Sequence, residues 1–109
     1  MYYGIVFSDS KSFIVMPIKK LLKKEIDSNL KELTGWKFLN NGIKKDFLFK
    51  DFNEAFAFLT RIAMLSEKMD HHAEWSGVYN KVHIRLSTHD AGGVTQKDIE
   101  MATSIEKYL

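Results

Sequence analysis

Cysteine is absent from the 109-residue sequence, and its absence excludes several kinds of site. Without a thiol, the chain can form no disulfide framework, no thiolate nucleophile and no cysteine-ligated zinc or iron–sulfur centre. Proline occurs once, at Pro17, and no stretch rich in proline and glycine separates two halves of the chain. A chain of this length builds one hydrophobic core. We therefore expect a single domain.

The sequence also lacks a long apolar run and a strong excess of charge of either sign. No run approaches the roughly 20 apolar residues that span a bilayer. The 16 basic and 14 acidic residues leave a formal charge of +2, which is too small to indicate a nucleic-acid partner. The N-terminal stretch has neither the basic start nor the cleavage site of a signal peptide. We therefore expect a cytoplasmic protein with no membrane partner.

The first third of the chain contains an N-terminal arm and a helical pattern. Residues 1–16 are expected to form a weak extended segment or a loose arm, unless Met16 is the true start. Pro17 suits the first position of a helix and Gly35 its end. Apolar residues recur between them at helical spacing: Ile18, Leu21, Leu22, Ile26, Leu30 and Leu33. We predict an arm over 1–16 and one domain over 17–109.

Lysines fill much of the remaining surface of this predicted helix: Lys19, Lys20, Lys23, Lys24 and Lys31. Such a run is usually a solvated helix face, and a basic patch for an acidic partner is the alternative. Glu25, Asp27 and Glu32 dilute the positive charge. The pattern therefore favours the solvated face.

A β-hairpin is predicted around Asn40-Asn41-Gly42, because Asn-Gly tolerates positive φ at both centres of a two-residue turn. Asp51 or Asn53 then caps a helix over 52–69. Apolar residues lie on more than one side of that helix: Phe52, Phe56, Phe58, Leu59, Ile62, Ala63, Met64, Leu65 and Met69. A sheet covers one such face, so the second face predicts a subunit interface and a homo-oligomer.

The last third combines an alternating pattern with a final helix. Alternation over 78–87 predicts a half-buried antiparallel strand pair, or one long bent strand, interrupted near Asn80-Lys81. Ala91-Gly92-Gly93 predicts a turn, and Thr95 and Asp98 have the spacing of a capping box. The predicted order is α-β-β-α-β-β-α. This is an α+β fold with a four-stranded antiparallel sheet and three helices packed on one face.

Three of the four histidines lie near the ends of these elements: His71, His72 and His89. Two adjacent histidines cannot both face the core, so one of the pair is expected to be exposed. Histidine can give and take protons near neutral pH. Acids nearby in the sequence can orient the rings: Glu67, Asp70, Asp90 and Asp98. Spacing alone leaves a proton-transfer site and a set of capping or solvated histidines both open.

Other chemistry has little support in the sequence. Histidines at i and i+1 point apart on a helix, and no spacing matches a zinc motif, so we expect no metal site. His83 lies in the middle of a predicted strand and is expected to be structural or on the surface. Gly92-Gly93 predicts a turn rather than a phosphate-binding loop.

The segment DHHAEWSGVYNKVHIRLSTHD, residues 70–90, resembles the pterin-4a-carbinolamine dehydratases, also called the dimerization cofactor of a homeodomain transcription factor. The preceding stretch FKDFNEAFAFLTRIAMLSEKM extends the match without a gap. The spacing of the family's signature is reproduced by Glu67, His71-His72, Tyr79, His89 and Asp98. The resemblance covers about residues 18–109. It implies the same α+β fold, assembled as dimers or dimers of dimers.

The resemblance implies a hydro-lyase. Its substrate would be 4a-hydroxytetrahydropterin and its products quinonoid dihydropterin and water, in recycling of a tetrahydrobiopterin-type cofactor. No metal or organic cofactor is expected. The alternative is a binding module that stabilises the dimeric state of a transcription factor or another protein partner.

The resemblance also assigns roles to individual residues. The expected catalytic residues are His71, His72, His89 and Asp98. His71 and His89 are the expected acid/base pair, and His72 mainly binds and orients the substrate, with an exchange of these roles as the alternative. Asp98 is expected to hold or polarise His89 while it caps the last helix. The expected substrate-binding residues are Glu67, Asp70, Trp75, Ser87, Thr88, Asp90 and Lys97. Ordinary packing is the alternative for Trp75, and bracing of the histidine pair is the alternative for Glu67.

Overall fold

The computed structural model describes residues 3–7 and 13–109. A two-stranded antiparallel hairpin comes first, formed by β1 (Tyr3–Phe7) and β2 (Phe13–Pro17). These strands agree with the prediction of an extended segment within residues 1–16. Residues 1–2 and 8–12 lie outside the described residues. The domain boundary after residue 16 stays a prediction.

The first helix, α1 (Lys23–Leu30), begins and ends within the predicted span. Pro17 does not start it, because Pro17 is the last residue of β2. The backbone before α1 is instead held by a distant partner, since the Leu21 N–H donates to the Val94 carbonyl at 2.8 Å. Glu25 then accepts from the Leu22 N–H at 2.9 Å and caps the helix at that point. A long-range backbone bond thus fixes the chain just before the helix begins.

The predicted hairpin is confirmed, with its turn one residue earlier than expected. It joins β3 (Lys37–Leu39) to β4 (Gly42–Leu48). Asn40 and Asn41 are the two residues at positive φ, 52° and 60°, whereas Gly42 pairs with Leu39 in the ladder. Asparagine tolerates this conformation because its short side chain can bond locally.

Two further strands complete a four-stranded antiparallel sheet in the order β3-β4-β6-β5. They are β5 (Glu74–Val78) and β6 (Lys81–Leu86), joined by a turn in which Tyr79 has a φ of 53°. The expected strand start at residue 78 is wrong, because the first strand of the pair begins at Glu74. All five residues of β5 are exposed, as suits an edge strand, so its sequence carries no pattern of alternating burial.

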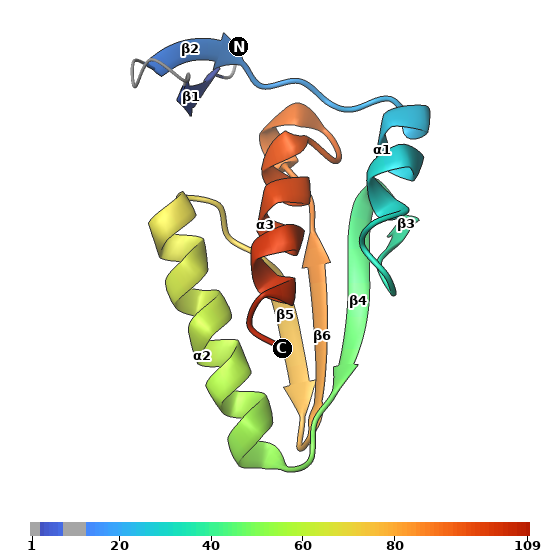
Figure 1. Cartoon of the computed structure of the whole chain (residues 1–109), viewed down its shortest axis with the longest axis vertical. Helices are drawn as coiled ribbons and strands as arrows, with labels where there is room; N and C mark the ends of the chain where they lie inside the picture. Colours follow the sequence, from blue (N-terminus) through green and yellow to red (C-terminus); the bar gives the residue numbers. More distant parts are fainter. Residues whose placement is uncertain (1–2, 8–12) are drawn as a thin grey trace.

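The helices α2 (Phe52–Met69) and α3 (Gln96–Glu106) lie in front of this sheet (Figure 1). The order α-β-β-α-β-β-α is therefore confirmed after the N-terminal hairpin. Fully buried side chains from the sheet meet those of the two helices in one core: Ile43, Val82, Ile84, Leu86, Ile62, Met101 and Ile105. Asp51 caps α2 as predicted, accepting from the Glu54 N–H at 2.9 Å.

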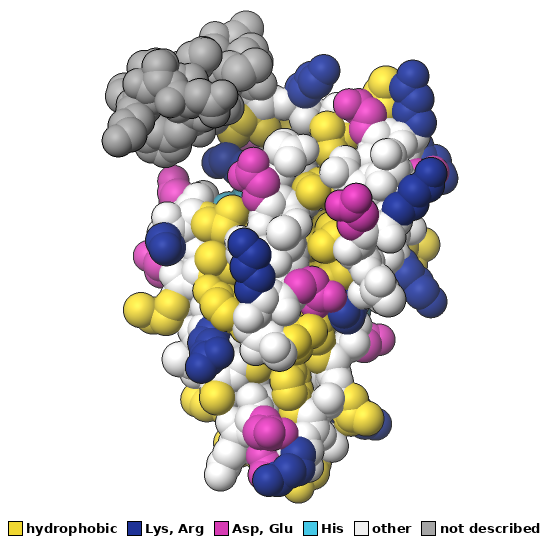
Figure 2. Space-filling model, viewed as in Figure 1, with side chains coloured by type: hydrophobic (Ala, Val, Ile, Leu, Met, Phe, Trp, Pro, Cys, Tyr) yellow, Lys and Arg dark blue, Asp and Glu magenta, His cyan; other side chains and the backbone are white. Residues whose placement is uncertain are grey.

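The second apolar face of α2 is present and lies open in the single chain. Phe58, Leu59 and Ile62 point into the core, whereas Phe52, Phe56 and Met64 are exposed. Figure 2 shows apolar side chains along the outer side of this helix. Within residues 3–7 and 13–109, no helix has the length and apolar character needed to cross a membrane.

Candidate functional site

The end of one helix and a segment some twenty residues later in the sequence converge at one end of the sheet (Figure 1). They are the C-terminal end of α2, the short 3-10 turn η1 (His89–Ala91) and the start of α3. All of the residues predicted to be catalytic lie in these segments or within three residues of them. The topology alone therefore brings the segments of His71, His72 and His89 to one end of the sheet.

A buried hydrogen bond between His71 and Asp98 joins the end of α2 to α3. The His71 Nε2 lies 2.6 Å from the Asp98 Oδ1. The side chain of His71 is 9% exposed and that of Asp98 is 0% exposed. A carboxylate this deep requires partners for both of its oxygens. His71 supplies one of them.

The other oxygen of Asp98 has two further donors. Oδ2 accepts from the Thr95 N–H at 2.9 Å and from the Thr88 hydroxyl, also at 2.9 Å. The first bond is the Asp98 half of the predicted capping box, which is confirmed. Three donors around one carboxyl group suit its ionised form, so Asp98 accepts the Nε2 proton of His71. In the neutral ring, the lone pair is then on Nδ1.

This geometry corrects the expected partner of Asp98. The carboxylate holds His71, not His89. Asp98 is the third residue of α3 and points inward, where the chain returns from α2. His89 begins η1 and is exposed to solvent. The expectation that Asp98 serves a ring and a cap at once is right, with a different ring.

His72 has its own carboxylate partner at the surface. Its Nε2 lies 3.0 Å from the Glu67 Oε1, and the two side chains are 64% and 73% exposed. Between them Asp70 ends α2 in the left-handed conformation, with a φ of 50°. The backbone therefore turns sharply before the histidines. As predicted, one of the two adjacent rings is buried and the other is exposed.

The remaining predicted residues differ in their burial and in their partners. Ser87 is half-buried and donates its hydroxyl to the Asn41 carbonyl at 2.8 Å. Asp90 is exposed and Lys97 is half-buried. Trp75 is 52% exposed and lies opposite Ile84, on the sheet face that the helices cover. Thr88, next to His89, connects η1 to Asp98 through its hydroxyl.

Sequence reasoning assigned Thr95 a capping role only. Its hydroxyl oxygen lies 2.7 Å from that of Thr88, and Thr95 is fully buried. In the sequence, the capping-box spacing of Thr95 and Asp98 is the signal that points to this contact. Thr95 therefore contacts the hydroxyl that donates to Asp98.

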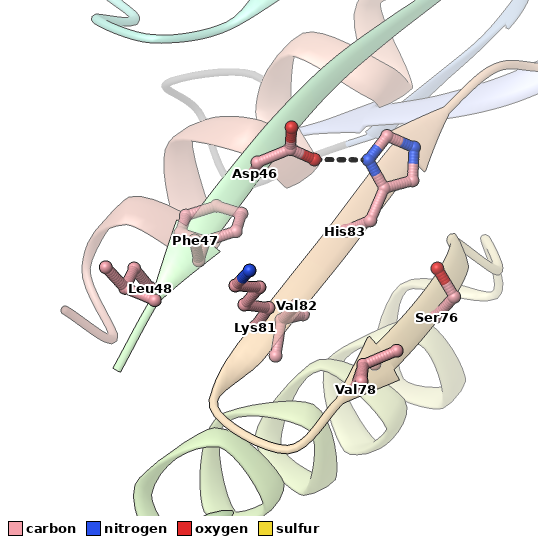
Figure 3. A pocket seen from close by; sticks show the side chains of 9 residues that line it. Asp46, Phe47, Leu48, Ser76, Val78, Lys81, Val82 and His83 are labelled. Carbon is pink, nitrogen blue, oxygen red and sulfur yellow. Dashed lines mark hydrogen bonds and ion pairs between the residues drawn. The ribbon is translucent and has the colours of Figure 1, made fainter. Parts of the chain in front are cut away.

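A separate hollow lies on the opposite, open face of the sheet (Figure 3). None of the predicted site residues lines it. In it His83 and Asp46 are cross-strand neighbours, with the Nδ1 of His83 2.5 Å from the Asp46 Oδ1. The hydrogen bond from His83 lowers the pKa of the Asp46 carboxyl, and the lysines nearby add to this effect. His83 lies on the surface, as the sequence predicts.

Metal ligation has no candidate in the part of the chain that the structure describes, where no group of three or more histidine, aspartate or glutamate side chains could hold an ion. What the site does contain is two ring–carboxylate pairs, and imidazole rings held by carboxylates can accept and release protons near neutral pH.

Fold and site together define a small α+β domain with a histidine cluster at one end of its sheet. A family model described as pterin 4 alpha carbinolamine dehydratase matches residues 19–108. The chain belongs to the pterin 4 alpha carbinolamine dehydratase family, a family of hydro-lyases. The resemblance found in the sequence is confirmed.

Relatives from several bacteria support this membership. A protein of Mesorhizobium japonicum assigned as a pterin-4-alpha-carbinolamine dehydratase is 50% identical over 96 residues, covering 86% of this chain and 98% of the relative. One of Prochlorococcus marinus with the same assignment is 47% identical, covering 80% and 92%. The crystal structure of a transcriptional coactivator/pterin dehydratase from Brucella melitensis superimposes with a TM-score of 0.80 at 39% identity, covering 83% of this chain and 98% of that one.

Proposed function

We propose that this chain dehydrates 4a-hydroxytetrahydropterin to quinonoid dihydropterin by histidine acid/base catalysis, as a step in the recycling of a tetrahydrobiopterin-type cofactor. The observation that carries the proposal is the buried His71–Asp98 pair beside the exposed His72 and His89. Membership in the dehydratase family supports the substrate class.

The reaction consists of two proton transfers and one bond cleavage. The hydroxyl on C4a leaves as water when a general acid protonates it. The proton on the adjacent ring nitrogen N5 goes to a general base, and its electron pair forms the C4a=N5 bond. No electron acceptor is consumed, so side chains that transfer protons suffice without a metal or organic cofactor.

His71 is the proposed base and His89 the proposed acid. Asp98 fixes the Nε2 proton of His71, which leaves Nδ1 to accept a proton, and the carboxylate then stabilises the cationic ring. His89 is exposed on η1, where it can exchange protons with water between turnovers. Each proton transfer contributes about 10²–10⁴-fold.

The other residues of the cluster bind the pterin in this proposal. His72 orients the ring, and Glu67 holds His72 in place through their 3.0 Å ion pair. Polar groups on both sides of the histidines pair with the amide-like edge of the pterin: Asp70, Ser87, Thr88, Asp90 and Lys97. Trp75 provides an apolar wall, with half of its surface free.

The test follows the ultraviolet absorbance of freshly generated 4a-hydroxytetrahydropterin as it decays, with and without the protein. We expect the protein to accelerate the decay, and His71→Ala and His89→Ala each to remove most of that acceleration. His83→Ala is the matched control, because it deletes an exposed histidine from the opposite sheet face. Unaccelerated decay with a folded sample would refute the dehydratase proposal.

A second candidate function is binding of a protein partner through the outer face of α2. Phe56 is 55% exposed and Met64 is 68% exposed on that face, and the solved relative from Brucella melitensis is described as a transcriptional coactivator as well as a pterin dehydratase. The first expected partner is a second copy, giving a dimer or a dimer of dimers in the cytoplasm.

Light scattering on a size-exclusion column tests the assembly. We expect a multiple of the 12.7 kDa chain mass, and a shift toward the single-chain mass for Phe56→Glu combined with Met64→Glu. Thr60 lies one turn from both Phe56 and Met64 on the same face, so Thr60→Glu should shift the mass in the same direction. A wild-type protein at single-chain mass would rule out the homo-oligomer.

A further inference from the structure

We propose that Thr95 is a positioning residue that acts on His71 through Thr88 and Asp98. The inference rests on the proposed acid/base role of His71. It concerns the two threonine hydroxyls that lie in series behind the carboxylate, on the side away from the imidazole ring.

Counting protons fixes the direction of this series. The Thr88 hydroxyl has one proton, and it donates that proton to the Asp98 Oδ2 at 2.9 Å. In its 2.7 Å contact with the Thr95 hydroxyl, Thr88 must therefore be the acceptor and Thr95 the donor. The chain of donors runs from Thr95 to Thr88 to Asp98, and the carboxylate accepts the Nε2 proton of His71 at its other oxygen.

Burial gives this series its effect. Thr95 and Asp98 are both 0% exposed, so bulk water does not compete for their polar atoms. Hydrogen bonds in a chain polarise one another when the local dielectric is low. The Thr88 hydroxyl and the Thr95 N–H both donate to Oδ2, which leaves Oδ1 to accept from His71. The position of the carboxylate, and with it the tautomer of His71, is thus fixed from behind.

Burial also separates positioning from substrate contact. A fully buried hydroxyl cannot touch the pterin, so Thr95 can influence turnover only through its neighbours. Removal of the Thr95 hydroxyl is therefore expected to lower kcat and to leave KM nearly unchanged. Thr88 is half-buried and next to His89, so its substitution would mix the two effects. Thr95 is the cleaner position to test.

The experiment compares Thr95→Val, Thr95→Ser and Thr103→Val in the full chain. Valine keeps the volume and the Thr95 N–H but removes the hydroxyl donor, whereas serine keeps the donor. Thr103 is the matched control on α3, since its hydroxyl bonds the Ile99 carbonyl one turn earlier in the same helix. We expect kcat to fall about three- to tenfold in Thr95→Val, the effect of one hydrogen bond, with KM nearly unchanged. Thr95→Ser and Thr103→Val should keep the wild-type kcat.

A spectroscopic arm tests the positioning without substrate. In ¹⁵N-labelled protein, the Nε2–H of His71 should give a downfield proton signal that exchanges slowly, assigned by its loss in His71→Gln. Thr95→Val should move this signal upfield and speed its exchange with water, whereas Thr95→Ser should leave it in place. Melting temperatures of the three variants report any loss of helix capping.

Two results would overturn the inference. One is a Thr95→Val protein with the wild-type kcat and an unchanged His71 signal. The other is a Thr95→Ser protein whose kcat falls as much as that of Thr95→Val. The shape of the Thr95 side chain, and not its hydroxyl, would then be what matters. A wild-type protein that does not accelerate dehydration would instead refute the proposed function, and the His71 signal would still decide the positioning chain.

Discussion

Two histidine–aspartate pairs of nearly equal length lie on opposite sides of the sheet. His71 and Asp98 are 2.6 Å apart, and His83 and Asp46 are 2.5 Å apart. The side chains of the first pair are 9% and 0% exposed, and those of the second are 41% and 84% exposed. Distance alone therefore does not distinguish them. The comparison shows that burial and the surrounding donors decide what such a pair can do.

The two pairs differ in their surroundings as well as in depth. Asp98 accepts two further hydrogen bonds, from Thr88 and from the Thr95 backbone, so its position is fully determined. Asp46 points into solvent from the middle of β4 and is held to β6 by strand register. Water competes for an exposed pair and weakens its attraction. The buried pair can hold a proton in place, and the exposed pair mainly adjusts surface charge.

The largest expected difference is in activity. Asp98→Asn replaces one carboxylate oxygen with an NH₂ group, which cannot accept a hydrogen bond. This NH₂ group must face at least one of the three donors around Asp98, so the position of the His71 Nε2 proton is disturbed. We expect kcat to fall about 10²–10⁴-fold, the full contribution of one proton-transfer group. Asp46→Asn makes the same chemical change on the open face and should leave kcat unchanged. Equal losses in the two variants would contradict the assignment of the site.

Removing the rings tests the same comparison through stability. His71→Ala leaves a buried carboxylate oxygen without its hydrogen-bond donor, and we expect the free energy of unfolding to fall by about 3 kcal/mol. His83→Ala deletes an exposed partner and should cost less than about 1 kcal/mol. Denaturation by urea, read by circular dichroism, measures both. Similar costs would mean that Asp98 is less isolated from water than its burial indicates.

An intermediate effect is expected at the exposed ion pair within the site itself. Glu67→Gln keeps the shape of the side chain but removes the charge that faces His72 at 3.0 Å. Because both side chains are largely exposed, stability should change by less than about 1 kcal/mol. If Glu67 orients His72 for the pterin, KM should rise while kcat stays nearly constant. Lys68→Gln, one residue further along α2, controls for the general change in charge.

The sequence predicted the elements and the candidate residues better than it predicted their contacts. The hairpin at Asn40–Asn41, the long helix α2 and the Asp98 cap follow from local rules that depend on a few neighbouring residues. The partner of Asp98 depends instead on how α3 packs against the end of α2, which no local pattern encodes. His71 and Asp98 are 27 residues apart, so their contact is a property of the assembled fold.

The errors have a similar cause. Pro17 ends β2 rather than starting α1, and between the two the Leu21 N–H bonds the distant Val94 carbonyl. The start of the edge strand β5 was predicted four residues too late, because all of its residues are exposed and its burial does not alternate. The pair of Asp46 and His83 was invisible as well, because it arises from the register of β4 against β6. Local signals are informative where the neighbours in sequence are also the neighbours in space.

The smallest effect is expected from the pH dependence of the exposed pair. The bond from His83 holds the pKa of Asp46 below 3.8, its ordinary value, so the folded state favours the ionised carboxyl. A lowered pKa adds stability above the unfolded value, and this contribution disappears as the pH falls through the folded pKa. Asp46→Asn should therefore be slightly less stable than wild type at pH 6, by less than about 1 kcal/mol, and equally stable in strong acid. Added salt should shrink the difference at pH 6, because an exposed pair is screened. A difference that grows on acidification would contradict the sign of the pKa shift.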